Sequence, residues 1–312
     1  MAQRNLIMSL AKVIIAVAWA DRQLSTEEVN HLKRLLLRVP VGSNSDGVLT
    51  ANESAELDVY LHSPVSGEER NALIANLRDQ IKAPHERQLA LALIEELISA
   101  DGVVTPDERG VLKHIRSTLD PQSTNPLIPI LRTFGFFNDP QPPTLPREEL
   151  IGDYVNNRIF FNIRQQILVR DEYSHIGLSD ETARQMSLGL GMLLLVAIAD
   201  GPLNDEERVR IEATLHETWG LSDLHFKMIR DVIDQEINDL SLFQLTNQYR
   251  LRTNHVEQLN LLNHLCITAI SDGEINAAES AIIGQIANSF GMRNEELIAA
   301  KEYAKKFAKR LA

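Results

Sequence analysis

The sequence predicts an all-α protein built from two related helical domains. Apolar residues recur at helical spacing along most of the chain, no segment shows the alternation typical of a strand, and one acidic turn motif occurs four times. The 312 residues suffice for two domains with hydrophobic cores of their own. Because aromatic residues make up only 5% of the chain, these cores are expected to consist mainly of Leu, Ile, Val and Ala.

The repeated motif is an acidic turn between two helices. Each copy contains an aspartate, in three copies followed directly by glycine, and a glutamate seven residues after the aspartate. Arg22 replaces the glycine in the first copy, and Ser271 replaces an alanine in the last. The four copies read AWADRQLSTEE (18–28), ISADGVVTPDE (98–108), AIADGPLNDEE (197–207) and AISDGEINAAE (269–279).

The spacing of the four turns predicts how they pair into domains. Successive aspartates are 80, 99 and 72 residues apart, and the long middle interval contains a stretch, 121–146, with seven of the twelve prolines. Because proline breaks helices, part of this interval is expected to be a linker. The prediction is a first domain at 1–120, a proline-rich linker at 121–146 and a second domain at 147–312. Each domain is expected to have two pseudo-symmetric helix-turn-helix halves.

The apolar segment near the N-terminus allows two interpretations. Arg4, the apolar run Leu6–Ala20 and the small residues at its end imitate an export signal. The same run is the first helix of a repeat, so Ile7–Ala20 is expected to be a buried core helix with Lys12 on its exposed side. No apolar run reaches the roughly 20 residues needed to span a bilayer, and the expected location is the cytoplasm.

Residues Arg147–Ile176 are expected to form a helical extension at the start of the second domain. Their apolar residues recur at the spacing of an amphipathic helix. The favoured interpretation is that this helix packs on the second domain. The alternative is a partner-binding surface with Phe160 or Phe161 exposed.

Most features of the repeated turn follow from making a tight connection between helices. An N-cap residue precedes each second helix, and the glutamate of the motif comes three residues later, which completes a capping box. An apolar residue before each cap is expected to pack as a hydrophobic staple, and the glycines are expected to adopt the left-handed conformation that ends a helix. The caps are Ser25, Thr105, Asn204 and Asn276, and the glycines are Gly102, Gly201 and Gly273.

The aspartate is the exception, because it follows the C-terminal end of a helix, where the helix dipole disfavours negative charge. Hydrogen bonds within the turn would explain it, and so would a divalent cation, Ca²⁺ or Mg²⁺, which prefers oxygen ligands. The interval from Asp to Glu equals that between positions 5 and 12 of an EF-hand loop, whose other ligands are missing here. Two half-sites in one domain would therefore share a cation. The candidate ligands are Asp21, Glu28, Asp101, Glu108, Asp200, Glu207, Asp272 and Glu279.

A fifth acidic loop, SNSDGVLTANE at 43–53, matches an EF-hand loop at more positions. However, Gly42 stands at the first ligand position, and Pro40 interrupts the entering helix. An ordinary acidic loop is therefore favoured over a cation site. The matching residues are Asn44, Asp46, Gly47, Leu49, Thr50 and Glu53.

The repeated turn resembles that of the tellurite-resistance TerB family, a helical domain with two pseudo-symmetric halves. The resemblance covers about 7–120 and 179–300, and so implies two tandem TerB-like domains. It also implies non-catalytic cytoplasmic modules, with acidic surfaces that can bind metal, in stress responses and in membrane-linked protein complexes. The residues that carry it are Ala100-Asp101-Gly102 with Glu108, Ala199-Asp200-Gly201 with Glu207, and Ser271-Asp272-Gly273 with Glu279, whereas Ala20-Asp21-Arg22 with Glu28 departs at the glycine.

Other classes of function receive little support from the sequence. With a formal net charge of −12, the chain lacks the concentrated basic face of a nucleic-acid binder. The nine histidines do not recur in the repeats, and no nucleophile elbow, P-loop or dinucleotide motif is present, so an enzyme is the least favoured class. Gly189 and Gly191 are interpreted as sites of close helix packing. The single cysteine, Cys266, is expected to be buried.

The sequence therefore predicts a non-catalytic binding or scaffold module with an unidentified protein partner. In the first hypothesis its acidic turns bind Ca²⁺ or Mg²⁺. In the second the protein is a metal-free helical adaptor.

Overall fold

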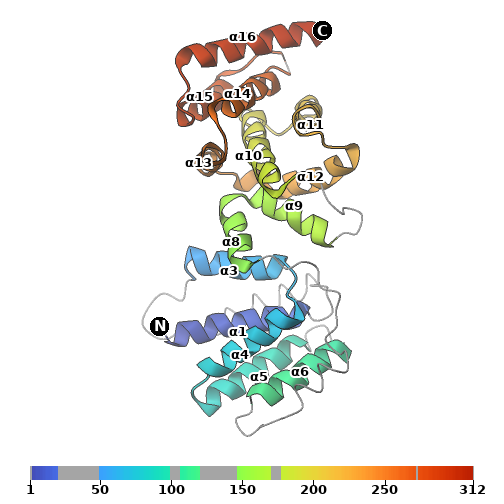
Figure 1. Cartoon of the computed structure of the whole chain (residues 1–312), viewed down its shortest axis with the longest axis vertical. Helices are drawn as coiled ribbons and strands as arrows, with labels where there is room; N and C mark the ends of the chain where they lie inside the picture. Colours follow the sequence, from blue (N-terminus) through green and yellow to red (C-terminus); the bar gives the residue numbers. More distant parts are fainter. Residues whose placement is uncertain are drawn as a thin grey trace. The chain divides into compact units, whose positions relative to one another are not determined.

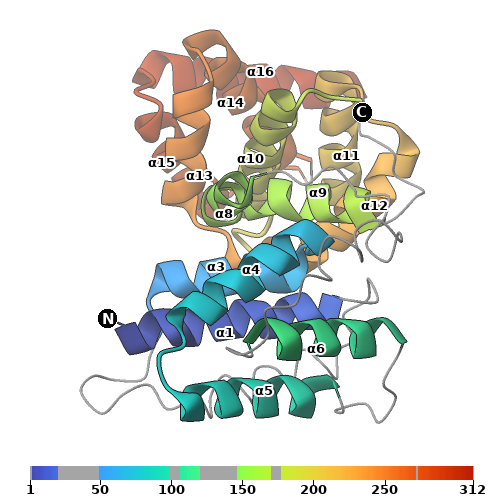
Figure 2. The ribbon, with the colours of Figure 1, turned by 60° about the horizontal axis from the view of Figure 1, so that its bottom comes forward.

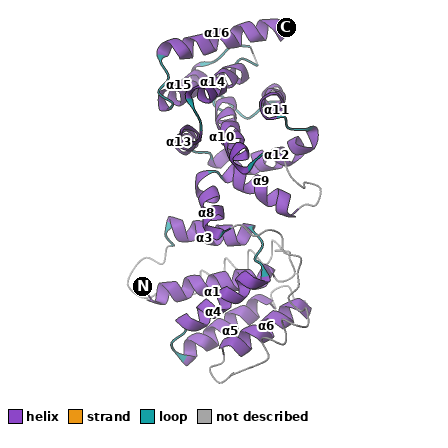
Figure 3. Cartoon of the chain, viewed as in Figure 1, coloured by secondary structure: helices purple, strands orange, loops and turns teal. Residues whose placement is uncertain are grey.

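The computed structural model describes residues 2–19, 49–98, 106–119, 146–169, 177–271 and 273–311. These residues form fourteen α-helices and one short 3₁₀ helix, without a strand among them (Figure 1, Figure 3), which confirms the all-α class. The chain divides into two compact units, Met1–Arg147 and Glu148–Ala312. No helix of the described ranges combines the length and the apolar character that a membrane-spanning segment needs.

The first unit is assembled around its N-terminal helix. Helix α1 contacts all four of the other helices of the unit, and its residues from Leu10 to Ala18 are buried apart from Lys12 (Figure 2). The helices are α1 (Ala2–Ala18), α3 (Ala51–His62), α4 (Gly67–Gln80), α5 (Pro84–Ile98) and α6 (Pro106–Leu119).

The burial of α1 agrees with the core helix expected at Ile7–Ala20, but the expected exposure of Lys12 is wrong. The Nζ of Lys12 lies 2.5 Å from Oε1 of Glu56 on α3, and its side chain is 19% exposed. The same ammonium group lies 5.8 Å from the ring centre of Tyr60. Because α3 packs over this side of α1, the lysine is covered and pairs with a carboxylate instead of facing solvent.

The second unit is assembled around α10, which runs through its middle (Figure 1). Twelve of the eighteen residues of α10 are buried, so the helix meets neighbours on nearly every side. It contacts α9, α11, α13, α14 and α15. The elements are α8 (Arg147–Asn156), α9 (Arg158–Val169), α10 (Asp180–Ala197), α11 (Asp205–Trp219), α12 (Asp223–Glu236), the 3₁₀ helix η2 (Ile237–Asp239), α13 (Leu242–Arg252), α14 (His255–Ala269), α15 (Ala277–Ser289) and α16 (Asn294–Leu311).

Two glycines allow the neighbours of α10 to approach closely, as the sequence suggested. A Cβ atom on Gly191 would lie 2.8 and 2.9 Å from the methyl carbons of Leu245 on α13 and 3.2 Å from Ile159 on α9. A Cβ atom on Gly189 would lie 3.2 Å from the ring of Trp219. Cys266 is buried in the same core, as expected, and burial raises the pKa of its thiol to about 12.

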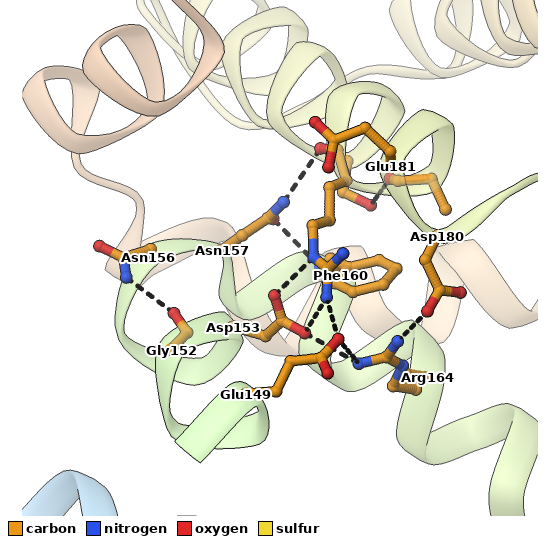
Figure 4. A network of polar contacts seen from close by, with 12 residues as sticks. Glu149, Gly152, Asp153, Asn156, Asn157, Phe160, Arg164, Asp180 and Glu181 are labelled. Carbon is orange, nitrogen blue, oxygen red and sulfur yellow. Dashed lines mark hydrogen bonds and ion pairs between the residues drawn. The ribbon is translucent and has the colours of Figure 1, made fainter. Parts of the chain in front are cut away.

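The extension formed by α8 and α9 is tied to α10 by a network of ion pairs (Figure 4). Asp153 of α8, which is 6% exposed, accepts hydrogen bonds from Nη1 of Arg164 at 2.9 Å and from Nε of Arg184 at 2.7 Å. Both guanidinium groups lie 4.8 Å from the ring centre of Phe160. Phe160 and Phe161 are 3% and 0% exposed. This burial supports packing within the chain, and the hypothesis of an exposed phenylalanine surface is wrong.

We expect Gly191→Ala to destabilise the second unit by about 1–3 kcal/mol, because the added methyl group would overlap Leu245 in a filled core. The measurement is urea unfolding of the full chain in a Trp19→Phe background, so that fluorescence reports Trp219 of the second unit. The matched control is Gly284→Ala on α15. A Cβ atom there has no neighbour within 4 Å, and the better helix propensity of alanine should stabilise by about 0.4–1 kcal/mol. Equal effects of the two substitutions would contradict the packing argument.

We expect Asp153→Asn to lower the free energy of unfolding of the second unit by about 3–5 kcal/mol, because two nearly buried guanidinium groups lose the carboxylate between them. The control is Asp180→Asn, which removes a carboxylate that also pairs with Arg164 but is 61% exposed. Its cost should stay within about 1 kcal/mol. The same urea unfolding experiment measures both, and a small effect at Asp153 would contradict the role given to the network.

Candidate functional site

The third and fourth acidic turns both belong to the second unit. The third connects α10 to α11, and the fourth connects α14 to α15. Helices α10 and α14, which lead into the two turns, pack against each other. In the first unit the helices that lead into the first two turns, α1 and α5, also pack against each other.

Both turns of the second unit end in the capping boxes that the sequence predicts. Oδ1 of Asn204 accepts from the backbone N–H of Glu207, and Oε2 of Glu207 accepts from that of Asn204, both at 2.9 Å. Asn276 and Glu279 repeat this exchange at 3.0 and 2.9 Å. Glu207 and Glu279 are 2% and 1% exposed, so the cap bonds account for carboxylates that would otherwise be costly to bury.

The apolar residues before the two caps pack on the core, but the expected hydrophobic staples are not formed, because the fourth helical positions hold the polar residues Arg208 and Ser280. Leu203 and Ile275 are partly buried against the hydrophobic core of the second unit. The prediction of a left-handed conformation is wrong for Gly201, which is not among the described glycines with positive φ, whereas Gly273 has a φ of 131°. The C-cap of α10 is Ile198, with φ −85° and ψ 5°. The helix therefore ends without a glycine in the left-handed conformation.

The two turns are joined to each other by one side-chain hydrogen bond. Nδ2 of Asn276, the cap of the fourth turn, donates to Oδ2 of Asp200 in the third turn at 2.6 Å. Asp200 is exposed and Asn276 is half-buried. Asp200 follows the C-terminal end of α10, where the helix dipole disfavours its charge. It contacts the N-cap residue of α15, 76 positions further along the chain.

The segment that contains both turns matches a known family. Residues 188–302 match the family described as Tellurite resistance protein TerB. This segment is a TerB domain. No curated protein and no solved structure matches the chain.

The TerB domain runs from the middle of α10 into α16 and so contains Asp200, Asn204, Glu207, Asn276 and Glu279. The match covers one copy of the domain. The tandem copy expected at 1–120 is not part of it and stays a prediction, as do the domain bounds of 1–120 and 147–312.

The other predicted site residues do not belong to the described parts of these two turns. Asp21, Glu28, Asp101 and Asp272 lie outside the described residues, as does the linker up to residue 145. The backbone of Glu108 belongs to the first turn of α6. Within the ranges that the structure describes, no group of three or more His, Cys, Asp or Glu side chains is arranged to hold a metal ion.

The described end of the 43–53 loop shows how its glutamate is used. Glu53, at the last position of the EF-hand pattern, accepts from the backbone N–H of Thr50 at 2.7 Å and from Nε of Arg4 at 2.6 Å. The hydrogen bonds from Arg4, followed by those from Thr50, lower the pKa of Glu53 to about 2. This carboxylate caps α3 and pairs with α1, which favours the ordinary-loop interpretation.

The sequence indicates only a capping role for Asn276, and its contact with Asp200 was not predicted. An N-cap asparagine is explained by its own helix, so nothing local in the sequence indicates a second partner.

We expect Asn276→Asp to destabilise the TerB domain by about 1–2 kcal/mol, because aspartate keeps the cap but loses the donor to Asp200 and places two carboxylates together. The control is Asn204→Asp, which keeps the equivalent cap of α11 and should be nearly neutral. Urea unfolding at low and high salt measures both, and salt should reduce the difference by screening the repulsion. Equal costs at the two caps would contradict the cross-turn contact.

Proposed function

We propose that the TerB domain of this chain is a non-catalytic binding module whose paired turns bind a divalent cation. The family description links the domain to tellurite resistance. We place the protein in a stress-response assembly of the cytoplasm, which its partners attach to a membrane. The observation that carries the proposal is the 2.6 Å hydrogen bond between Asp200 and Asn276, which holds two acidic turns against each other.

The aspartates of the turns can supply the oxygen ligands that a hard cation needs. Asp200 is exposed, and only its Oδ2 takes part in the bond with Asn276, which leaves Oδ1 for a ligand. Carboxylate oxygens are the preferred ligands of Ca²⁺ and Mg²⁺. Asp272 has the equivalent sequence position in the fourth turn and would supply the second carboxylate.

The glutamates serve this proposal indirectly. Glu207 and Glu279 are buried and hold the N-cap backbone of their own turns, so they fix the shape of the loop that carries each aspartate. Because both carboxylates are buried and hold the caps, neither is placed to exchange a proton with a substrate.

Ca²⁺ is preferred over Mg²⁺ in this proposal. Irregular loops suit the flexible coordination of Ca²⁺, whereas Mg²⁺ demands near-octahedral geometry and keeps its waters. With few side-chain ligands, the dissociation constant is expected to be about 10⁻⁵ to 10⁻³ M.

A metal-free adaptor is the second candidate, and one observation favours it. Phe243 and Leu251 on α13 are 80% and 69% exposed, and Val256 at the start of α14 is 65% exposed. Exposed apolar side chains that gather in one patch are typical of surfaces that contact another protein. This candidate needs no cation at the turns.

We expect Ca²⁺ at a hundredfold excess over its dissociation constant to stabilise the TerB domain by roughly 2.7 kcal/mol. For a unit of this size the melting temperature should rise by roughly 5–10 °C. Asp200→Asn should abolish the rise while keeping the fold, because asparagine can still accept the hydrogen bond from Asn276. The measurement is differential scanning calorimetry of the full chain with CaCl₂, with MgCl₂ and with NaCl at equal ionic strength.

The matched control is Asp205→Asn, which removes an exposed carboxylate five residues further along the chain, in the first turn of α11. This variant should keep the Ca²⁺-dependent rise. A wild-type protein whose melting ignores millimolar Ca²⁺ and Mg²⁺ alike would leave the metal-free adaptor as the function.

A further inference from the structure

A polar pocket of about 330 Å³ lies in the first unit, where three helix ends meet. Its residues come from the end of α4, the connection from α4 to α5, the start of α5 and the end of α6. Helices α5 and α6 lie side by side in opposite directions, which brings the last turn of α6 to the first turn of α5 (Figure 2). This volume is in the lower range of pockets that hold small molecules.

The pocket is basic in a chain that is acidic overall. Arg78, Lys82 and Arg87 line it together with a single carboxylate, Asp79, whereas the whole chain has a formal net charge of −12. Because charges more than about 10 Å apart are largely screened at moderate salt, the local excess of cations decides which ligands the pocket attracts.

Two of the three cations have a structural explanation. Arg78 donates from Nε and Nη2 to Oδ1 of Asp79 at 3.0 and 2.8 Å, and Nζ of Lys82 donates to the carbonyl oxygen of Asp79 at 2.7 Å. Both residues lie at the C-terminal end of α4, where the helix dipole favours positive charge. Their presence alone would not indicate a ligand.

Arg87 has no such explanation. It is the fourth residue of α5, at the end of the helix where the dipole disfavours positive charge. The carboxylate nearest in sequence, Glu86, accepts from the backbone N–H groups of Lys82 and Ala83 at 2.8 and 2.9 Å and so caps the helix. The Nε of Arg87 is buried and, among the described residues, has no hydrogen-bond partner.

A second unsatisfied polar atom faces the same pocket from α6. The hydroxyl group of Thr118 is buried and finds no hydrogen-bond partner within the described part of the chain. Buried polar groups are normally hydrogen-bonded, so the Nε of Arg87 and the hydroxyl group of Thr118 are two donors at one pocket that a ligand could satisfy. Ile81 and Leu119 complete the lining with apolar surface.

We propose that this pocket binds a small phosphorylated compound, with Arg87 and Thr118 donating to the phosphate oxygens and Ile81 and Leu119 contacting its organic part. Guanidinium groups suit phosphate because their fork of N–H donors matches its oxygens, and a hydroxyl group can donate to a third oxygen. Lys82 and Arg78 add positive charge at the rim. This site is separate from the acidic turns, and it stands or falls independently of the cation proposal.

The test uses the full chain and two probes, inorganic phosphate and phenyl phosphate, in titrations followed by isothermal calorimetry at constant ionic strength. We expect saturable binding of both, with phenyl phosphate tighter because its ring contacts the apolar lining. Arg87→Gln should weaken binding of phenyl phosphate at least tenfold, and Thr118→Val, which keeps the size of the side chain, should weaken it severalfold. Circular dichroism and the melting temperature check that each variant is folded.

The matched control is Arg116→Gln, which removes an arginine of α6 that pairs with Glu95 at 2.7 Å and does not line the pocket. It should bind both probes as the wild type does. The proposal is overturned if the wild type shows no saturable binding, if Arg87→Gln and Thr118→Val bind as tightly as the wild type, or if Arg116→Gln weakens binding equally.

Discussion

The second unit depends on the burial of α10 on nearly every side. An apolar helix of this length is stable only when other helices cover it, and five helices do so. Gly191 has no side chain, which allows Leu245 and Ile159 to approach the backbone of α10. Helices α13 and α9 therefore pack closely on α10 at this point. The end of α10 then places Asp200, and the packing of α14 on α10 places the fourth turn beside it.

The acidic turns show how one short motif can satisfy two requirements. Within each of the two turns of the second unit, the asparagine and the glutamate complete the hydrogen bonds of a helix start. This explains their spacing of three residues. Between the turns, the amide of Asn276 reaches Asp200. The aspartate thus has a structural partner and still presents a carboxylate to solvent, which is why both hypotheses for the turns begin at the same residue.

What the sequence could predict follows from how local each feature is. Helix periodicity, capping boxes and the burial of Cys266 and Phe160 depend on neighbouring residues or on simple polarity, and these predictions agree with the structure. The pairing of Lys12 with Glu56 and the contact of Asn276 with Asp200 depend on which helices pack together, and no local pattern indicates that. Gly201 does not adopt the expected left-handed conformation, because α10 already ends at Ile198, three residues before this glycine.

The basic pocket of the first unit could not be predicted from the sequence either, although the position of Arg87 indicated it. Arg87 stands in the first turn of a helix, where a positive charge is out of place, just as the aspartates stand behind the ends of theirs. Arg87 is therefore as unusual in its place as Asp200 is. Its partner in the pocket, Thr118, is an ordinary hydroxyl in a last turn, and only the antiparallel packing of α5 and α6 brings the two together.

The buried ion pairs of Asp153 also bear on how this chain could have evolved. The segment that matches the TerB family begins at residue 188, inside α10, whereas the network that fixes the start of that helix joins it to α8 and α9. The segment that matches the family is therefore shorter than the unit that folds. A gene fusion that transferred only the matched segment would carry half of the central helix without its N-cap, Ser179, and without Arg184. Recombination that preserves this domain must therefore break the chain before α8.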